Sequence, residues 1–261
     1  MIITFGNFKG GIGKTTTTLL FGYILEKMYS KKVLLIDTDP QMNLTELAEM
    51  SYKQELNREK NIFSASFDQL PTAEHIQPLG DSIDILAGSW GIGEFEKYAH
   101  EYYEEKYLNL IFSSVLSEVE DEYDFILIDT APTTNLVNDN AIIASNYVVL
   151  PTQTVPLAFD STKKYYMYLR EITNVSDDFE ILGVVPYLVG RSATDTEFLA
   201  KYKDFFLEDL FTNVIQHSDR VKTWSYKGIT DDKPYDKRTL GMFADVVEEA
   251  LNRIKEFELH V

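Results

Sequence analysis

The chain has 261 residues, of which 44% are hydrophobic and 25% charged, so it can bury a sizeable core and is not biased toward a disordered or fibrous protein. It has no cysteine, which excludes a disulfide scaffold, thiolate catalysis and cysteine-based metal centres. The net charge of -18 argues against broad affinity for nucleic acid, because an acidic surface repels phosphate. No basic leader or run of membrane-spanning length is present, so we expect one cytoplasmic domain over residues 1–261.

A glycine-rich turn separates the first apolar run from the first helical pattern. Residues 2–5 predict a buried strand, and residues 17–28 predict a helix because apolar side chains recur there every three to four positions. The turn offers inward-pointing backbone N–H groups, a lysine charge and a hydroxyl that can ligate magnesium. It therefore predicts a phosphate-binding loop, made of Gly10, Gly11, Ile12, Gly13, Lys14, Thr15 and Thr16.

Two carboxylates follow the second apolar run, residues 33–36. Sites in doubly wound sheets lie at the carboxyl ends of the strands, so Asp37 and Asp39 should face the phosphate-binding loop. We expect Asp37 to hold magnesium through water. We expect Asp39, two residues further along an extended chain, to orient or deprotonate the attacking water.

A third apolar run, residues 125–128, ends in Asp129. We expect this carboxylate to bind magnesium opposite the Thr15 hydroxyl. Further strands are predicted within residues 76–87, 147–150 and 181–188, and further helices at 44–58, 94–122, around 140–141, and at 165–172, 198–210 and 242–258. This alternation predicts an α/β fold with a doubly wound, mostly parallel sheet and helices on both faces.

The region 214–238 carries more basic residues than the rest of this acidic chain. Arg220, Lys222 and Lys227 lie in it, and Arg191 is expected nearby because it too follows a predicted strand. Such a local patch is the one place where DNA phosphates could be held, although a solvated loop of mixed charge also fits. The dense acidic face of residues 94–122 fits either plain helix packing or contact with a basic partner.

The loop resembles the deviant Walker A motif of the ParA/MinD family of P-loop ATPases, because Lys9 precedes the glycine pair and Phe8 stands where ordinary phosphate loops have glycine. The run that begins at Asp37 resembles the family's second motif, with Met42 in place of a glycine. The resemblance implies ATP and Mg²⁺ as ligands. It also implies an ATP-sandwich homodimer in which Lys9 reaches the partner's nucleotide and acts catalytically beside Asp39.

By this resemblance the chain is a small partition ATPase without the N-terminal helix-turn-helix domain of larger relatives, because the lysine motif begins at residue 9. The implied partners are a centromere-binding adaptor and non-specific DNA, which would place the protein on the nucleoid. A membrane partner is not expected, since the C-terminal helical segment is acidic. The net charge keeps a second function open, in which the ATPase positions a protein or other non-DNA cargo.

Overall fold

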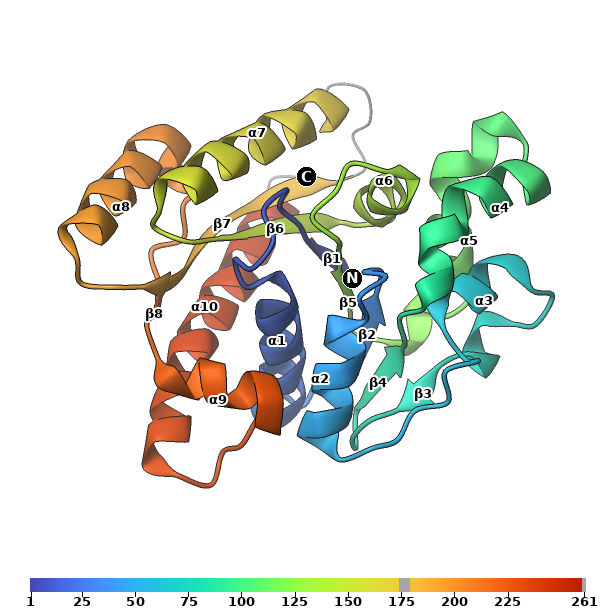
Figure 1. Ribbon diagram of the computed structural model, residues 1–261, viewed down its shortest axis with the longest axis horizontal. Coiled ribbons are helices and arrows are strands. Elements are labelled where there is room, and N and C mark those ends of the chain that lie inside the picture. Colours follow the sequence, from blue (N-terminus) through green and yellow to red (C-terminus); the bar gives the residue numbers. More distant parts are fainter. Residues whose placement is uncertain (174–178, 260–261) are drawn as a thin grey trace.

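A single eight-stranded sheet organises the chain, and the computed structural model describes residues 1–173 and 179–259 of it (Figure 1). The strands lie in the order β3-β4-β2-β5-β1-β6-β7-β8, and each pair is parallel except β3 with β4. The strands are β1 (Ile2–Phe5), β2 (Val33–Asp37), β3 (Gln77–Pro78), β4 (Ile83–Leu86), β5 (Phe125–Asp129), β6 (Tyr147–Thr152), β7 (Glu180–Val189) and β8 (Ile215–Gln216). This confirms the predicted doubly wound, mostly parallel sheet.

Helices cover both faces of the sheet (Figure 1). One face carries α1 (Lys14–Tyr29), α2 (Asn43–Tyr52), α9 (Asp219–Lys227) and α10 (Pro234–Leu259). The other carries α3 (Ile62–Phe67), α4 (Phe95–Tyr102), α5 (Ile111–Ser117), α6 (Leu136–Ile143), α7 (Pro156–Thr173) and α8 (Ala193–Phe206). Short 3-10 helices join them: η1 (Thr72–Glu74), η2 (Trp90–Glu94), η3 (Glu105–Leu110), η4 (Glu120–Glu122) and η5 (Leu207–Asp209).

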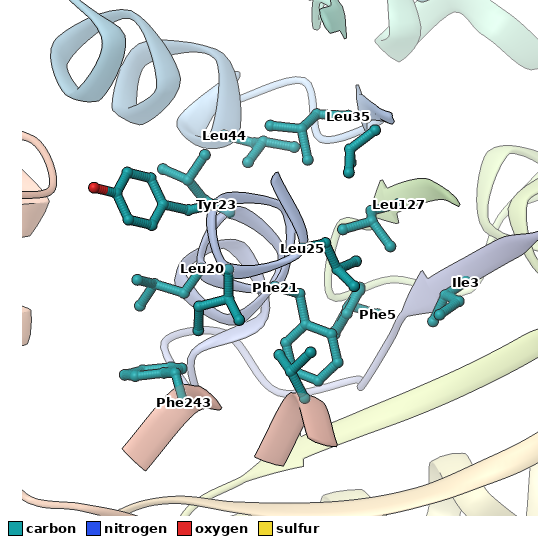
Figure 2. Packing of buried hydrophobic residues seen from close by; sticks show 14 of the residues in the cluster. Ile3, Phe5, Leu20, Phe21, Tyr23, Leu25, Leu35, Leu44, Leu127 and Phe243 are labelled. Carbon is teal, nitrogen blue, oxygen red and sulfur yellow. The ribbon is translucent and has the colours of Figure 1, made fainter. Parts of the chain in front are cut away.

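The central strands are apolar along their whole length because both of their faces are covered. In β2, Leu35 points into the core under α1 while its neighbours Leu34 and Ile36 join the core under α4 and α5. Figure 2 shows α1 packed between side chains of the sheet and of α2 and α10. This two-sided burial, favourable by about 25 cal/mol per Å² of apolar surface, fixes the strand ends that build the site.

Several predicted helices differ in extent from the observed ones: those expected at 165–172, 198–210 and 242–258 begin earlier, at Pro156, Ala193 and Pro234. Two others run well past the observed ends. The helix expected over residues 44–58 ends at Tyr52, because Lys53 adopts a left-handed conformation (φ 56°) and its N–H bonds to the carbonyl of Glu49. The continuous helix expected over residues 94–122 is broken after Tyr102, where Tyr103 becomes extended and donates its hydroxyl to the carbonyl of Ser66 at 2.8 Å. A local left-handed cap ends the first helix, whereas a tertiary contact of Tyr103 accompanies the break in the second.

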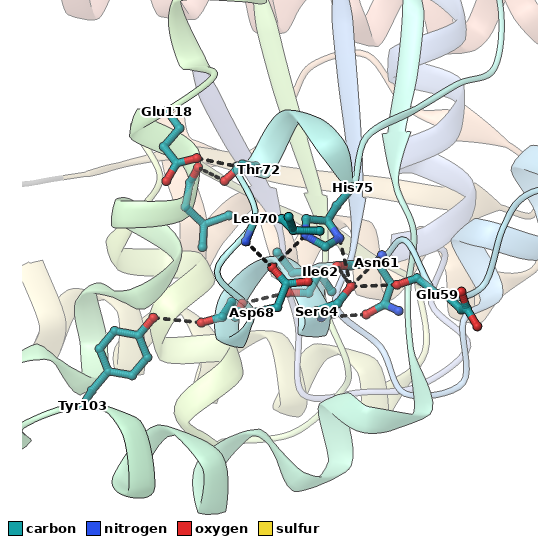
Figure 3. Close-up of polar contacts among 12 residues, drawn as sticks. Glu59, Asn61, Ile62, Ser64, Asp68, Leu70, Thr72, His75, Tyr103 and Glu118 are labelled. Carbon is teal, nitrogen blue, oxygen red and sulfur yellow. Dashed lines mark hydrogen bonds and ion pairs between the residues drawn. The ribbon is translucent and has the colours of Figure 1, made fainter.

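Two helices have no counterpart in the prediction, α3 and α9. α3 has only six residues and is fixed by polar contacts, since Asn61 accepts from the Ser64 N–H at 2.9 Å in a capping box (Figure 3). The buried His75 ring bridges the Ser64 hydroxyl and the Asp68 carboxylate, both at 3.1 Å. Among the described residues no helix is long and apolar enough to cross a bilayer.

Candidate functional site

The turn between β1 and α1 has the backbone shape of an anion-binding loop. Gly11 and Gly13 have φ of 76° and 99°, and Gly13 is the residue before α1, accepting the Thr17 N–H at 2.8 Å. A Cβ on Gly13 would lie 2.4 Å from the Tyr187 ring, so glycine is required there. No side chain caps α1, which leaves its first N–H groups available to a phosphate.

Lys14 is the charged group of this loop. Its side chain is buried, and Nζ donates to the carbonyl of Lys9 at 3.3 Å. Burial lowers the pKa of Lys14, while the neighbouring Asp129 and Asp39 carboxylates act in the opposite direction. A buried ammonium group in a loop of open N–H donors is suited to a multiply charged anion.

Two strand ends bring the predicted magnesium residues together. Asp37 and Asp129 are paired across β2 and β5, and the Thr15 hydroxyl donates to Asp129 Oδ2 at 2.7 Å. Asp37 Oδ2 accepts from both the N–H and the hydroxyl of Thr45, at 2.8 and 2.7 Å. Burial, followed by the nearby Asp37 charge, raises the pKa of Asp129 to about 8, and burial raises the pKa of Asp37 to about 6.

The polar groups of this corner fit a divalent cation. Asp129 Oδ1 is buried and has no hydrogen-bond partner among the described residues. Two adjacent buried carboxylates repel each other, and a cation between them and the Thr15 hydroxyl would remove that cost. No cluster of three or more His, Cys, Asp or Glu residues forms a ready-made metal site in the described ranges. The set suits magnesium, which takes one or two carboxylates and completes its shell with phosphate oxygens and water.

Asp39 lies in the loop that follows β2 and lines the same pocket as Lys14 and Thr15. Its Oδ1 accepts the Gln41 N–H at 2.8 Å, and its carbonyl accepts the Met42 N–H at 2.9 Å. Met42 has φ 55°, a left-handed conformation that glycine adopts more easily. A methionine therefore makes the left-handed turn here, and α2 begins directly after it.

These groups open into a pocket of about 710 Å³ at the carboxyl end of the sheet. Its far wall comes from α2 and α9 and is partly apolar, with Leu47, Met50 and Val221 beside Tyr187. Sequence reasoning singled out none of these four residues. The one available signal was that Tyr187 follows a buried run at a strand end, which is where sites in such sheets lie.

Lys9 is placed differently from the rest of the loop. It is half-buried and does not line the 710 Å³ pocket in the described structure. Its N–H donates to Asn7 Oδ1 at 3.2 Å, and its carbonyl accepts from Lys14 Nζ. Asn7 was not singled out in the sequence, where nothing distinguished it from a polar loop residue.

The four basic residues predicted to meet DNA fall in three places. Arg191 and Arg220 line one pocket of about 650 Å³ between β8 and α10, together with Arg238. Arg220 is held there by Asp236, with Nε 2.6 Å from Oδ1. Lys222 lines the pocket of the phosphate loop instead, and Lys227 lies at the end of α9, exposed beside Tyr226.

The chain matches known proteins over most of its length. A family model described as an AAA domain matches residues 1–181. The virulence plasmid ParA family protein pGP5-D of Chlamydia psittaci is 28% identical over 76% of this chain and 73% of its own. The sporulation initiation inhibitor protein Soj of Bacillus subtilis is 27% identical over 95% of this chain and 97% of its own.

The fold likewise matches a solved structure. A variant of McdA from Cyanothece, determined in complex with ATP, superposes with a TM-score of 0.82 at 21% identity, covering 96% of both chains. At that identity the likeness concerns the fold alone, whereas the family model and the ParA-type relatives match the sequence itself. The phosphate loop, the paired aspartates and these matches agree, and the chain belongs to the ParA/MinD family of P-loop ATPases.

Proposed function

We propose that residues 1–261 form one domain that binds ATP with Mg²⁺, dimerises around it and hydrolyses it slowly to drive partition of a plasmid or chromosome. The observation that carries this proposal is the meeting of Thr15, Asp37 and Asp129 beside an open glycine loop, with a carboxylate oxygen of Asp129 left unpaired. This arrangement supports a bound metal and polyphosphate rather than a purely structural turn.

Each residue of the site has a task in this proposal. The backbone of Gly10 to Thr16 and the Lys14 ammonium group hold the phosphates. Thr15, Asp37 and Asp129 would hold magnesium, which would neutralise charge on the phosphate oxygens. Asp39 orients the attacking water and accepts its proton, since it lines the pocket and its carboxylate takes, from the described residues, only a local backbone hydrogen bond.

Lys9 completes the site of a second copy. Its position outside the chain's own pocket supports action on the partner's nucleotide, where its charge would stabilise the transferring phosphoryl group. Two copies must then meet before either site is complete. Turnover is therefore slow, and a centromere-binding adaptor would stimulate it by stabilising the complete dimer.

Non-specific DNA is the proposed track of the dimer. Arg191 and Arg220 share a concave surface with Arg238, which supports contact with phosphates, and Lys222 and Lys227 extend from the neighbouring α9. Arg220 already pairs with Asp236, so Arg191 is the better single test of this surface.

The net charge favours a second candidate function, an ATP-driven dimer that positions a protein cargo and does not touch DNA. The two candidates differ in one experiment: binding to non-specific duplex DNA with ATP, ADP or no nucleotide across a salt series. The partition proposal expects binding only with ATP, with a steep loss at higher salt. Lys9→Ala and Arg191→Ala should each abolish it, the first through the dimer and the second at the DNA surface. ATP-driven dimers that bind no DNA at low salt would contradict the partition proposal and favour the cargo function.

A further inference from the structure

Phe8 stands where phosphate-binding loops usually have glycine, and its ring is packed against α7. Its centroid lies 4.8 Å from the Tyr165 ring, edge to face at 87°, and 5.6 Å from the Tyr168 ring. Tyr165 is fully buried, whereas Phe8 is half-buried at the edge of the core under α7 and α8. A glycine here would leave the backbone free to adopt many conformations, whereas the aromatic contacts of Phe8 hold this part of the loop against α7.

The residue before Phe8 is fastened to the same helix. Asn7 Nδ2 donates to the Thr162 hydroxyl at 2.9 Å and to the carbonyl of Pro151 at 3.1 Å. Its Oδ1 accepts from the Ser161 hydroxyl at 3.1 Å and from the Lys9 N–H at 3.2 Å. The backbone of Lys9 is therefore linked to α7 through one buried amide side chain.

Four residues of α7 make these contacts, at positions that share one face of a helix: Ser161, Thr162, Tyr165 and Tyr168. The turn is shaped to receive them, since a Cβ on Gly6 would lie 2.0 Å from the Tyr165 hydroxyl. Tyr168 also donates to Asp139 of α6, which follows the loop after Asp129. This face of α7 thus contacts both the start of the phosphate loop and α6, which lies next to the site.

We propose that Phe8 is a positioning residue for Lys9: by packing against the rings of Tyr165 and Tyr168 it fixes the loop so that Lys9 is presented to a second copy of the chain and not to its own pocket. The inference rests on the proposed role of Lys9 in the partner's site. Phe8 has no proposed role in holding the chain's own nucleotide, because the residues proposed to hold its phosphates, Gly10 to Thr16, follow Phe8 and Lys9 in the sequence.

The test compares two aromatic truncations, Phe8→Ala before the glycine turn and Phe159→Ala on α7 itself. Phe159 is also half-buried and meets a buried tyrosine edge to face, with its centroid 4.9 Å from the Tyr202 ring, but no ring contact or hydrogen bond in the described structure joins it to the loop. For each variant, three quantities are measured: the Kd for ADP, the dimer fraction with ATP and Mg²⁺, and kcat for ATP. Lys9→Ala and the double variant Phe8→Ala with Lys9→Ala complete a cycle.

We expect Phe8→Ala to change the Kd for ADP less than threefold and to lower kcat and the dimer fraction about as far as Lys9→Ala does. The double variant should lose nothing more, because Phe8 acts through Lys9. Phe159→Ala should keep kcat within twofold. Should Phe8→Ala fail to fold, Phe8→Leu keeps most of the apolar volume without the ring contact and should show a smaller loss of kcat at unchanged Kd.

Three outcomes would overturn the inference, and they separate it from the function on which it rests. If Lys9→Ala abolishes turnover while Phe8→Ala behaves like Phe159→Ala, the positioning role is wrong and the proposed function stands. If the double variant loses much more than either single change, Phe8 acts independently of Lys9. If Lys9→Ala turns over normally, the role of Lys9 fails and the positioning role fails with it.

Discussion

Gly13 is the residue whose conformation the phosphate loop depends on most. It combines a φ of 99° with the Tyr187 ring at 2.4 Å from where a Cβ would be. We predict that Gly13→Ala abolishes nucleotide binding, whereas Gly93→Ala, where no atom lies within 4 Å of the added Cβ, leaves it unchanged. A fluorescent ADP analogue in equilibrium titration would decide. Unaltered affinity in Gly13→Ala would show that the loop described here is not the binding conformation.

Asp39 and Thr15 should separate catalysis from metal binding. Asp39→Ala removes the proposed base and should lower kcat by about 10²- to 10⁴-fold while ATP affinity stays within a few fold. Thr15→Ala removes the hydroxyl paired with Asp129 and should erase the gain in ATP affinity that Mg²⁺ provides. Single-turnover kinetics and titrations with and without Mg²⁺ measure the two effects. Equal losses of kcat and affinity in Asp39→Ala would contradict its assignment as the base.

For single residues, the sequence predicted the polar side chains at the ends of strands and in the loops that follow. Residue type and position after an apolar run were sufficient for this prediction. Thr15, Asp37, Asp39 and Asp129 were all expected near the phosphate loop, and the structure brings them there. Asn7, Tyr187 and Val221 were missed. Their importance comes from contacts between segments far apart in the chain, and no local pattern encodes such contacts.

The start of α8 is an element whose stability should depend on pH. Ser192 and Asp195 form a capping box, and Asp195 also accepts from the Thr154 hydroxyl. These hydrogen bonds, the Ser192 hydroxyl first, hold the pKa of Asp195 below its usual range. Since the pKa is lower in the folded state, the carboxylate stabilises the fold above the unfolded-state pKa of about 4, and this stability is lost as pH falls below it.

Asp195→Asn should accordingly lower the free energy of unfolding by about 1 kcal/mol near neutral pH, with a difference that shrinks in acid. Urea unfolding of both proteins across the acidic range measures it, with Asp204→Asn, an exposed position near the end of the same helix, as the matched control. A difference that is constant with pH would mean that the ionised carboxylate is not what stabilises the cap.

Helix ends also account for the errors in predicted extent. The pattern after Tyr52 continued to look helical, yet Lys53 turns left-handed and ends α2. We predict that Lys53→Gly stabilises the protein by about 1 kcal/mol, because glycine adopts that conformation without strain. Lys27→Gly within α1 should instead destabilise by a similar amount. Thermal unfolding of both variants checks the signs, and a loss of stability in Lys53→Gly would refute the left-handed cap.

Strands were easier to predict than helices for a physical reason. The central strands are buried on both faces, so continuous apolar runs marked them clearly at residues 33–36 and 125–128. The breaks in residues 94–122 come from Tyr103 and from Asn140, which accepts the Phe112 N–H at 3.1 Å. Both contacts join elements that are far apart in the sequence, so they cannot be predicted from the helical periodicity of residues 94–122.

At the scale of the whole molecule, the net charge predicts that added salt has opposite effects on dimerisation and on DNA binding. Two copies of a chain with charge -18 repel each other, so screening by moderate salt should strengthen the ATP-bound dimer. Binding of DNA through a basic surface should weaken over the same range. Sedimentation of the protein with ATP, alone and with duplex DNA, across a salt series measures both. A dimer that weakens with salt would indicate an interface held by ion pairs and not by the nucleotide.

The central claim is that ATP, and not ADP, joins two chains through Lys9. The most direct measurement is sedimentation velocity of the protein with Mg²⁺ and either nucleotide, for the wild type, Asp39→Ala and Lys9→Ala. The account predicts a dimer with ATP only, a longer-lived dimer for Asp39→Ala because hydrolysis is blocked, and monomer for Lys9→Ala although it still binds nucleotide. A wild-type chain that is saturated with ATP and stays monomeric would contradict it.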